Sequence, residues 1–186
     1  MAEYSLEEYI SDIRMVVAEE TEDSAITSRI KPLSKRLAAE KVWLNDAYRE
    51  VDAEQGFGLH LVHEEKNHDL AVFVIAWAPG KGLKAHNHKT WAVVAGVEGQ
   101  ECETSYRRLD DQSRSGFAEL QAISEETLFP GKVVSCMPED IHSVWNNGTD
   151  VAISLHTYGR HLNFTGRSIF DIDQKTEMPC VVRVQD

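Results

Sequence analysis

The sequence predicts a mainly β protein, a barrel or sandwich of short strands, preceded by a helical segment. From Gly58 onward, short apolar and β-branched runs follow one another with glycine and proline between them, which is typical of antiparallel strands. Before Gly58, apolar residues recur at helical spacing instead. At 186 residues the chain fits one domain with an extension. We therefore expect a helical extension, residues 1–55, packed on a β-barrel, residues 56–186.

The helical segment contains residues that favour the start of a helix. Ser5 followed by Glu8 matches a capping box, in which each side chain accepts a hydrogen bond from the other residue's backbone, and it predicts a helix from Leu6. The apolar residues of this helix are Leu6, Ile10, Ile13 and Val17. Pro32 suits the first turn of a second helix, predicted over residues 34–44. A third, shorter helix is predicted over residues 45–53.

The remainder divides into short predicted strands, because each run is apolar or alternating and is bounded by turn residues. The predicted strands are residues 70–77, 90–97, 101–106, 116–123, 132–137, 142–145 and 151–158. Residues 179–184 predict one more strand. The sequence Asn146-Asn-Gly-Thr-Asp150 predicts a hairpin turn between two of the strands.

Composition argues against several classes of function. The formal net charge is −12 and no block of basic residues occurs, so binding to nucleic acid or to an anionic membrane surface is not expected. The acidic N-terminus does not look like a secretory signal, and no run approaches the roughly 18 apolar residues of a membrane helix. Cys102, Cys136 and Cys180 are widely spaced and odd in number, as expected of reduced thiols in a cytoplasmic protein.

Three histidines are candidate metal ligands. His86 and His88 are one residue apart, and alternate residues of a β-strand point to the same face. His142, far along the chain, completes a set of three imidazoles, which suits iron, zinc, copper or nickel. A His-x-His pair is a weak signal by itself, and solvated strand residues are the alternative.

The residues around these histidines resemble the two signatures of the cupin superfamily. The first is a glycine, a spacer and His-x-His, matched by Gly80, His86 and His88. The second is matched, with one extra residue between glycine and proline, by Gly131, Pro138, His142 and Asn146. The usual glutamate ligand falls near Ala92 or Val93, and neither side chain binds metal. The resemblance therefore implies three histidine ligands without a carboxylate, which favours anionic incoming ligands such as a thiolate.

Within that superfamily, residues 59–171 are most similar to the thiol dioxygenases of the cysteine dioxygenase type. Ser154, His156 and Tyr158 alternate along a predicted strand and so share one face. The resemblance implies a relay in which Ser154 fixes the tautomer of His156, and His156 orients the Tyr158 hydroxyl toward substrate and oxygen. The alternative is three core side chains satisfied by backbone groups. Val93 replaces the cysteine that crosslinks to this tyrosine in animal enzymes, so Tyr158 is expected to be uncrosslinked.

The residue expected to bind the substrate carboxylate also differs from that of the animal enzymes. In those enzymes an arginine on an early strand binds the carboxylate. The matching position in this chain is near His60, where there is neither arginine nor glutamine. The segment from Tyr158 to Arg167 instead resembles the bacterial 3-mercaptopropionate dioxygenases, in which an arginine matched by Arg167 binds the carboxylate. The resemblance also places Trp91 near the metal. The alternatives are an ordinary strand residue for His60, a core position for Trp91 and a surface ion pair for Arg167.

The resemblance implies an enzyme, an iron-dependent thiol dioxygenase with one Fe(II) per chain. It would convert a small thiol carboxylic acid and O2 to the sulfinic acid, with 3-mercaptopropionate, cysteine and mercaptosuccinate all open as substrates. The expected partners are this substrate and O2, and the expected state is a monomer or small homo-oligomer. Two other classes stay open: a cupin metalloenzyme acting on a non-thiol substrate, and a non-catalytic, metal-stabilised cupin that binds a small acid.

Overall fold

The computed structural model describes residues 4–185, over which the chain has two α-helices, three short 3-10 helices and eleven β-strands. The helices are α1 (Leu6–Glu19), α2 (Asp23–Glu40), η1 (Asp46–Arg49), η2 (Lys66–His68) and η3 (Leu162–Phe164). The strands are β1 (Phe57–Glu64), β2 (Asp69–Trp77), β3 (Gly82–His86), β4 (Ala92–Glu98), β5 (Glu101–Arg108), β6 (Leu120–Leu128), β7 (Val133–Cys136), β8 (Ile141–Trp145), β9 (Ala152–Arg160), β10 (Ser168–Asp171) and β11 (Thr176–Pro179).

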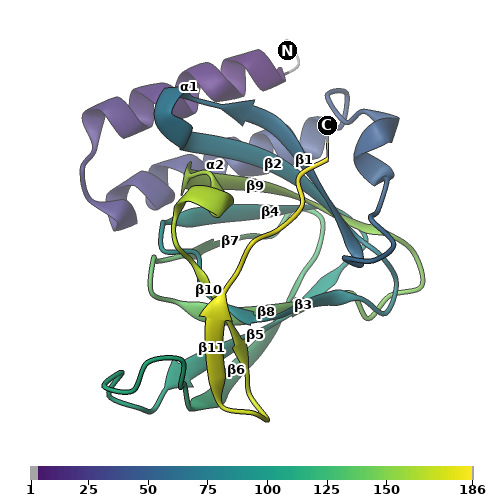
Figure 1. Ribbon diagram of the computed structural model, residues 1–186. Helices are drawn as coiled ribbons and strands as arrows, with labels where there is room; N and C mark the ends of the chain where they lie inside the picture. Colours follow the sequence, from purple (N-terminus) through teal and green to yellow (C-terminus); the bar gives the residue numbers. More distant parts are fainter. Residues whose placement is uncertain (1–3, 186) are drawn as a thin grey trace.

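The strands form two antiparallel sheets that pack face to face (Figure 1). One sheet has the order β1-β2-β9-β4-β7 and the other the order β11-β10-β3-β8-β5-β6. Without the flanking strands β1, β10 and β11, the two sheets are β2-β9-β4-β7 and β3-β8-β5-β6. This order is that of the double-stranded β-helix, a jelly-roll architecture shared by cupins. The predicted fold class, a mainly β cupin barrel with N-terminal helices, is confirmed.

Both helices cover the outer face of the five-stranded sheet (Figure 1). α1 begins at the predicted capping box, since Ser5 and Glu8 each accept the other's backbone N–H. The buried Tyr9 hydroxyl lies 2.8 Å from Ser34 Oγ of α2 and 2.5 Å from Thr157 Oγ1 of β9, so it ties both helices to the sheet. Within residues 4–185, no helix combines the length and the apolar character needed to cross a membrane.

Two helix predictions are corrected. α2 contains residues 34–40 of the predicted helix, but it begins at Asp23 and ends at Glu40, and it includes Pro32 in its interior, so the prediction of a first-turn proline is wrong. Pro32 removes one backbone hydrogen bond, but the buried apolar face of α2 continues on both sides of it and packs against the sheet. The helix predicted over residues 45–53 is reduced to the short η1.

The turn after β8 is not a hairpin. β8 belongs to the six-stranded sheet and β9 to the five-stranded sheet, so residues 146–150 cross between the sheets and that prediction is wrong. Asn146 is fully buried, and its Nδ2 donates to the carbonyl groups of Trp77 at 2.9 Å and Asp150 at 2.8 Å. Its Oδ1 accepts from the backbone of Gly148. The chain does bend at residues 148–150, but turn residues do not determine which sheet each flanking strand joins.

Two strand predictions are also corrected. The strand predicted over residues 116–123 is β6, which begins at Leu120 because Gly116 lies in a turn with a φ of 74°. The strand predicted over residues 179–184 is an irregular segment that follows β11. Its Cys180 and Val182 are buried in the core inside the barrel.

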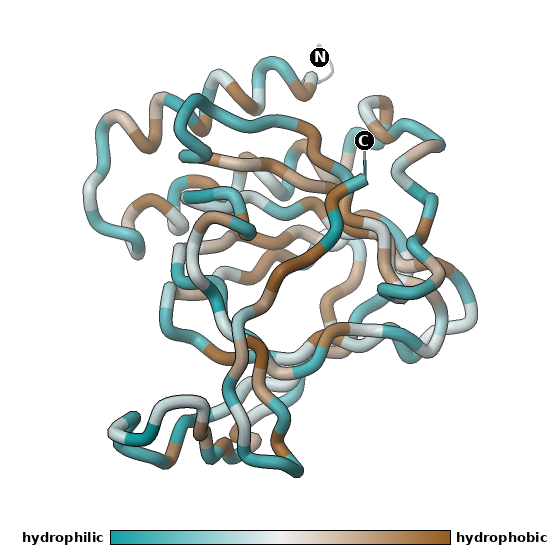
Figure 2. The backbone as a smooth tube through the Cα atoms, viewed as in Figure 1, coloured by the Kyte–Doolittle hydropathy of each residue, from teal (hydrophilic) through white to brown (hydrophobic). Residues whose placement is uncertain are grey.

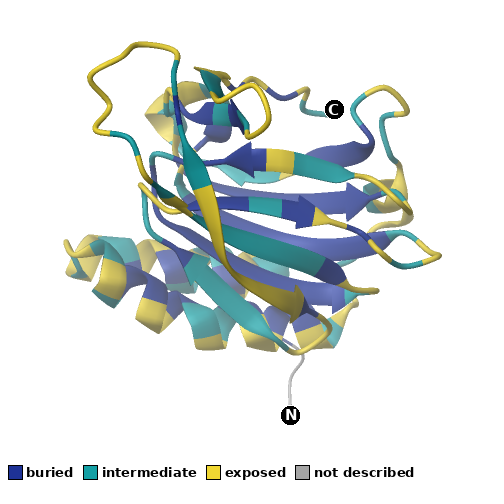
Figure 3. Ribbon diagram, turned by 90° about the horizontal axis from the view of Figure 1, so that it is seen from below, coloured by how far each residue is buried: buried dark blue, intermediate teal, exposed yellow. Residues whose placement is uncertain are grey.

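Burial follows the layers of the fold. The five-stranded sheet is apolar on both faces (brown in Figure 2), because one face meets the helices and the other faces the barrel interior. On β2, Val72 and Val74 pack in the helix-side core, whereas Phe73 and Ile75 pack in the interior core. β6, at the edge of the other sheet, is mostly exposed (yellow in Figure 3).

Candidate metal centre

Three histidines, two on neighbouring strands and one just beyond a strand end, meet inside the barrel. His86 ends β3, His88 lies two residues beyond it, and His142 on β8 is paired directly with His86. All three are buried, and one ring nitrogen from each lies within 4.8 Å of the others. His142 Nε2 and His88 Nε2 are 3.2 Å apart. The structure therefore brings the three predicted ligands together, although His88 lies beyond the end of the regular strand.

Two of the three histidines make a polar contact through Nδ1, whereas His88 Nδ1 has no hydrogen-bond partner among the described residues. His86 Nδ1 donates to the carbonyl of Lys84 at 2.8 Å, and His142 Nδ1 lies 3.0 Å from Glu103 Oε1. Burial lowers the pKa of His86 and of His88 well below the usual range, so both rings are neutral. Two ligand nitrogens that each lie about 2.1 Å from one metal ion are roughly 3 Å apart. The three histidines therefore fit a shared divalent metal.

A carboxylate behind His142 was not predicted from the sequence. β5 begins Glu101-Cys-Glu103-Thr-Ser105, and strand alternation places the side chains of its first, third and fifth residues on one face. A carboxylate at the outer nitrogen of a metal-binding histidine fixes the ring tautomer and raises its basicity, and Glu103 is placed to do this. Cys136 joins Glu103 and His142 in a second group of ligand atoms within 4.8 Å, which shares His142 with the first. The alternating acidic residues on β5 were the available signal.

We expect Glu103→Gln to weaken metal binding about 10- to 100-fold, because a neutral amide does not raise the basicity of His142. The measurement is competition between the protein and a chelating dye for zinc. Glu119→Gln is the control, since Glu119 pairs with Lys175 on the surface and its loss should leave the affinity unchanged. Equal affinities of the Glu103→Gln variant and the parent would show that this contact does not support the metal centre.

Ser154, His156 and Tyr158 form a hydrogen-bonded chain along β9. Ser154 Oγ lies 2.8 Å from His156 Nε2, and His156 Nδ1 lies 2.9 Å from the Tyr158 hydroxyl. The Tyr158 ring lies 5.1 Å from the ring of His88, so the chain ends beside the three histidines. Burial lowers the pKa of His156 to about 3, and its ring is neutral. One ring nitrogen of a neutral imidazole donates a hydrogen bond and the other accepts one, so the two hydrogen bonds of His156 run in the same direction along the chain.

Arg167 brings a positive charge into the same cavity. It lies between η3 and β10 and is only 2% exposed, so it is not in a surface ion pair. Its Nε and Nη2 have no hydrogen-bond partner among the described residues. Apart from the histidines, Tyr158 and Arg167, the cavity is lined by Phe57, Leu59, Ile75, Trp77, Leu83, Val144, Leu162 and Val182. A buried guanidinium in such apolar surroundings suits a carboxylate ligand, which it binds through two parallel hydrogen bonds.

His60 and Trp91, predicted as substrate-binding residues, do not line this cavity. On β1, Phe57 and Leu59 line it, so alternation turns His60 to the other face, where His60 Nε2 lies 2.9 Å from the carbonyl of Glu50. Trp91 packs in the core beneath the helices. Both residues therefore contact other parts of the fold and do not face the three histidines.

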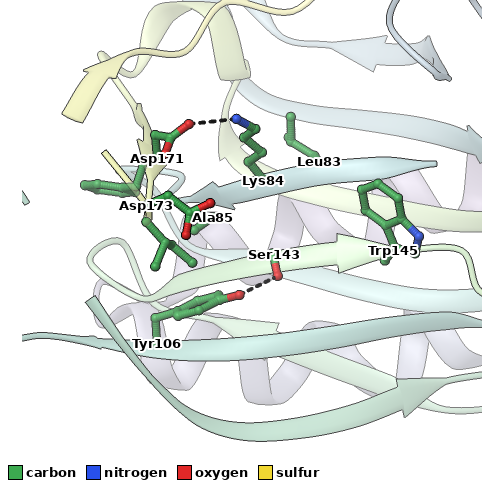
Figure 4. A pocket seen from close by; sticks show the side chains of 10 residues that line it. Leu83, Lys84, Ala85, Tyr106, Ser143, Trp145, Asp171 and Asp173 are labelled. Carbon is green, nitrogen blue, oxygen red and sulfur yellow. Dashed lines mark hydrogen bonds and ion pairs between the residues drawn. The ribbon is translucent and has the colours of Figure 1, made fainter. Parts of the chain in front are cut away.

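A second hollow lies on the outer face of the six-stranded sheet (Figure 4). It has a volume of about 310 Å³, and Trp145 is among its lining residues. Lys84 pairs with Asp171 at 2.8 Å beside it, and the Tyr106 hydroxyl lies 3.1 Å from Ser143 Oγ. His86, His88 and His142 do not line this hollow, so it is separate from the candidate metal centre.

The chain matches no protein-family model. An uncharacterized conserved protein with a double-stranded beta-helix domain from Klebsiella pneumoniae is 17% identical, with a TM-score of 0.48 over 68% of this chain and 93% of that one. An oxalate oxidase in complex with the substrate analogue glycolate is 13% identical, with a TM-score of 0.45 over 60% of this chain and 54% of that one. A cupin domain of an XRE-family transcriptional regulator from Enterobacter cloacae is 14% identical, with a TM-score of 0.41 over 57% of this chain and 99% of that one.

The strand order of this chain is by itself sufficient to define the architecture. Its two sheets wind as a double-stranded β-helix, and the three histidines lie inside that barrel. The protein therefore has the cupin fold, with a histidine cluster suited to a metal ion.

Proposed function

We propose that this protein is a non-haem iron thiol dioxygenase that converts a small thiol carboxylic acid and O2 to the sulfinic acid. The observation that carries the proposal is one cavity lined by the three histidines, by Tyr158 and by the buried guanidinium of Arg167. Such a cavity suits a ligand with a thiolate at one end and a carboxylate at the other. The reaction is balanced without a further reactant, because RSH and O2 together give RSO2H.

The residues of the chain bind and orient the reactants. Arg167 binds the carboxylate through its unpartnered N–H donors and so directs the sulfur toward the histidines. The apolar walls exclude water, which strengthens this ion pair. Tyr158, held by His156, supplies a hydrogen bond near the reacting atoms. Bound ferrous iron supplies the oxygen chemistry, although three histidines also accept other divalent metals.

The cavity favours a thiol acid that carries no charged group other than its thiolate and one carboxylate. Its lining includes one cation, Arg167, and no carboxylate that would pair with an ammonium group. Burying an unpaired ammonium or a second carboxylate costs on the order of several kcal/mol. We therefore favour 3-mercaptopropionate over cysteine and mercaptosuccinate.

Removing the Tyr158 hydroxyl should separate metal binding from turnover. We expect Tyr158→Phe to retain iron and to lose about 100-fold in kcat, because the histidines are unchanged while the hydrogen bond near the reacting atoms is lost. Iron content and O2 uptake are measured on the same preparation. Tyr106→Phe, which removes a hydroxyl on the outer face, is the control and should match the parent. An unchanged kcat in Tyr158→Phe would exclude the relay from the mechanism.

The test of the function is O2 consumption by ferrous-loaded protein, with the product identified by mass. The thiols are 3-mercaptopropionate, cysteine, mercaptosuccinate and cysteamine, and propionate is the thiol-free control. We expect uptake with 3-mercaptopropionate, one sulfinate per O2, and little turnover of cysteamine, which has no carboxylate. No uptake with any thiol by iron-containing protein would overturn the proposal. A cupin metalloenzyme with a non-thiol substrate or a non-catalytic small-acid-binding cupin would then remain.

A further inference from the structure

The cavity beside the three histidines is closed in this structure. Its volume is about 20 Å³, which is room for about one water molecule. A thiol acid is several times larger than a water molecule, and a metal ion held by the histidines would occupy part of the same space. Whatever ligand binds there, the wall of the cavity must open to admit it.

One wall of the cavity is an extended segment, residues 180–185, which we call the strap. It follows β11 of the six-stranded sheet and reaches β1 of the five-stranded sheet, where Gln185 and His60 form an isolated parallel bridge. Figure 1 shows it, in yellow, crossing from one sheet to the other. Val182 is buried and lines the cavity, whereas its neighbour Val181 is 79% exposed. A single layer of chain therefore separates the cavity from solvent at this point.

The middle of the strap is held by two amide side chains and not by a strand ladder. Asn163 Nδ2 donates to the carbonyl of Val182 at 2.8 Å, and the Val182 N–H donates to Asn163 Oδ1 at 3.1 Å. Gln55 holds the next residue in the same way. The Arg183 N–H donates to Gln55 Oε1 at 2.8 Å, and Gln55 Nε2 donates to the carbonyl of Arg183 at 3.3 Å. Water can replace both amide groups, so releasing these two residues breaks no hydrogen bond within either sheet.

The ends of the strap are also lightly held. The Cys180 N–H donates to the carbonyl of Arg167 at 2.9 Å, and the Gln185 N–H donates to the carbonyl of Leu59 at 2.8 Å. The Oε1 atom of Gln185 is buried without a hydrogen-bond partner among residues 4–185, which costs stability at this end. The side chain of Arg183 makes ion pairs on the surface, where such pairs contribute little.

We propose that the strap opens as one unit and so gives a metal ion and a ligand access to the three histidines. Opening removes Val182 from the cavity wall. It also breaks the contact between Cys180 and the carbonyl of Arg167, so the strap is directly connected to the proposed carboxylate-binding residue. The small volume of the closed cavity supports the inference for any ligand. Only the identity of that ligand as a thiol acid rests on the proposed function.

The first test is amide hydrogen exchange of the zinc-loaded parent, followed by NMR. The donors of the strap include the N–H groups of Cys180, Val182 and Gln185. After correction for intrinsic rates, we expect them to exchange together and at least about 100-fold faster than the N–H groups at the centre of β9. Exchange as slow as that of β9 would show that the strap opens only when the barrel unfolds, and would overturn the proposal.

The second test increases the population of the open strap. Asn163→Ala removes both side-chain hydrogen bonds to Val182. We expect exchange of the Cys180 and Gln185 N–H groups, whose own acceptors are unchanged, to rise about 10-fold. Release of bound zinc to a chelator should rise by the same factor. The equilibrium affinity for zinc should stay the same, because an open strap speeds uptake as much as release.

Matched variants show whether these effects belong to the strap. Gln55→Ala, which removes the other amide group, should act in the same direction. Thr149→Ala, which removes a surface contact with Asp150, should match the parent. Unchanged exchange at Cys180 and Gln185 in Asn163→Ala would show that the strap does not open as a unit.

Unchanged zinc release from a variant with faster strap exchange would show that access lies elsewhere, and would also overturn the proposal. If Asn163→Ala does not fold, Gln55→Ala and the exchange of the parent still decide the question. Neither measurement involves a thiol or O2, so both test the strap separately from the proposed function.

Discussion

Replacing His86 with alanine should abolish stable metal binding. The substitution removes one of the three histidine nitrogens that lie within 4.8 Å of one another and could hold a metal ion, and it leaves two. Loss of a residue behind a ligand already costs about 10- to 100-fold in affinity, so loss of the ligand should cost more than about 100-fold. The measurement is the iron and zinc content of the His86→Ala variant after dialysis, by atomic emission.

The control for this prediction is His63→Ala. His63 contacts Glu65 at 2.8 Å and does not belong to the three-histidine group, so its loss should leave the metal content unchanged. Retention of a full metal complement by His86→Ala would show that the metal binds elsewhere. Equal losses in both variants would show that the effect is not specific to the cluster.

Replacing Arg167 with alanine should raise the KM for 3-mercaptopropionate about 100-fold while iron is retained. Arg167 is 2% exposed and two of its donors have no partner among the described residues, so a bound carboxylate would form a buried ion pair with it. Truncating one partner of such a pair costs about 2 to 5 kcal/mol. The KM and kcat of the Arg167→Ala variant are measured by O2 uptake, with the iron content determined in parallel.

Two comparisons identify the cause of that change. Arg167→Lys keeps the charge without the planar fork, so it should recover only part of the affinity. Arg183→Ala, which removes a surface arginine paired with Asp52 and Glu54, should behave as the parent. Cysteamine has no carboxylate, so its turnover should depend little on Arg167. An unchanged KM for 3-mercaptopropionate in Arg167→Ala would show that the carboxylate binds elsewhere.

Local spacing predicted much of the candidate site. Ser154, His156 and Tyr158 alternate on β9, and alternation alone places them on one face, where the structure shows them linked by hydrogen bonds. His86 and His88 also lie close together, although the strand ends between them. These residues were accessible to sequence reasoning because short-range periodicity sets their relative direction.

Other residues were beyond sequence reasoning because strands of the five-stranded sheet carry apolar residues on both faces, including the edge strand β1. His60 was predicted at the substrate because it falls near the early-strand arginine of the resembling enzymes, and no pattern in β1 shows that it faces the other way. The same ambiguity explains why the sequence does not decide whether Ala92 or Val93 stands at the position of the usual glutamate ligand. The structure places Ala92 in the interior core and Val93 beneath the helices.

The sequence by itself predicted the fold class and placed Ser154, His156 and Tyr158 on one face, because these follow from short motifs and from strand periodicity. The grouping of His86 and His88 with His142 as metal ligands, and the role of the Ser154–His156–Tyr158 chain, were implied by the resemblance to cupin enzymes. Only the tertiary structure decided which strands are neighbours. It put β8 and β9 in different sheets across the turn at residues 146–150, and it placed Glu103 beside His142. These contacts join residues far apart in the chain, and their partners are chosen by the packing of two sheets, which no local pattern encodes.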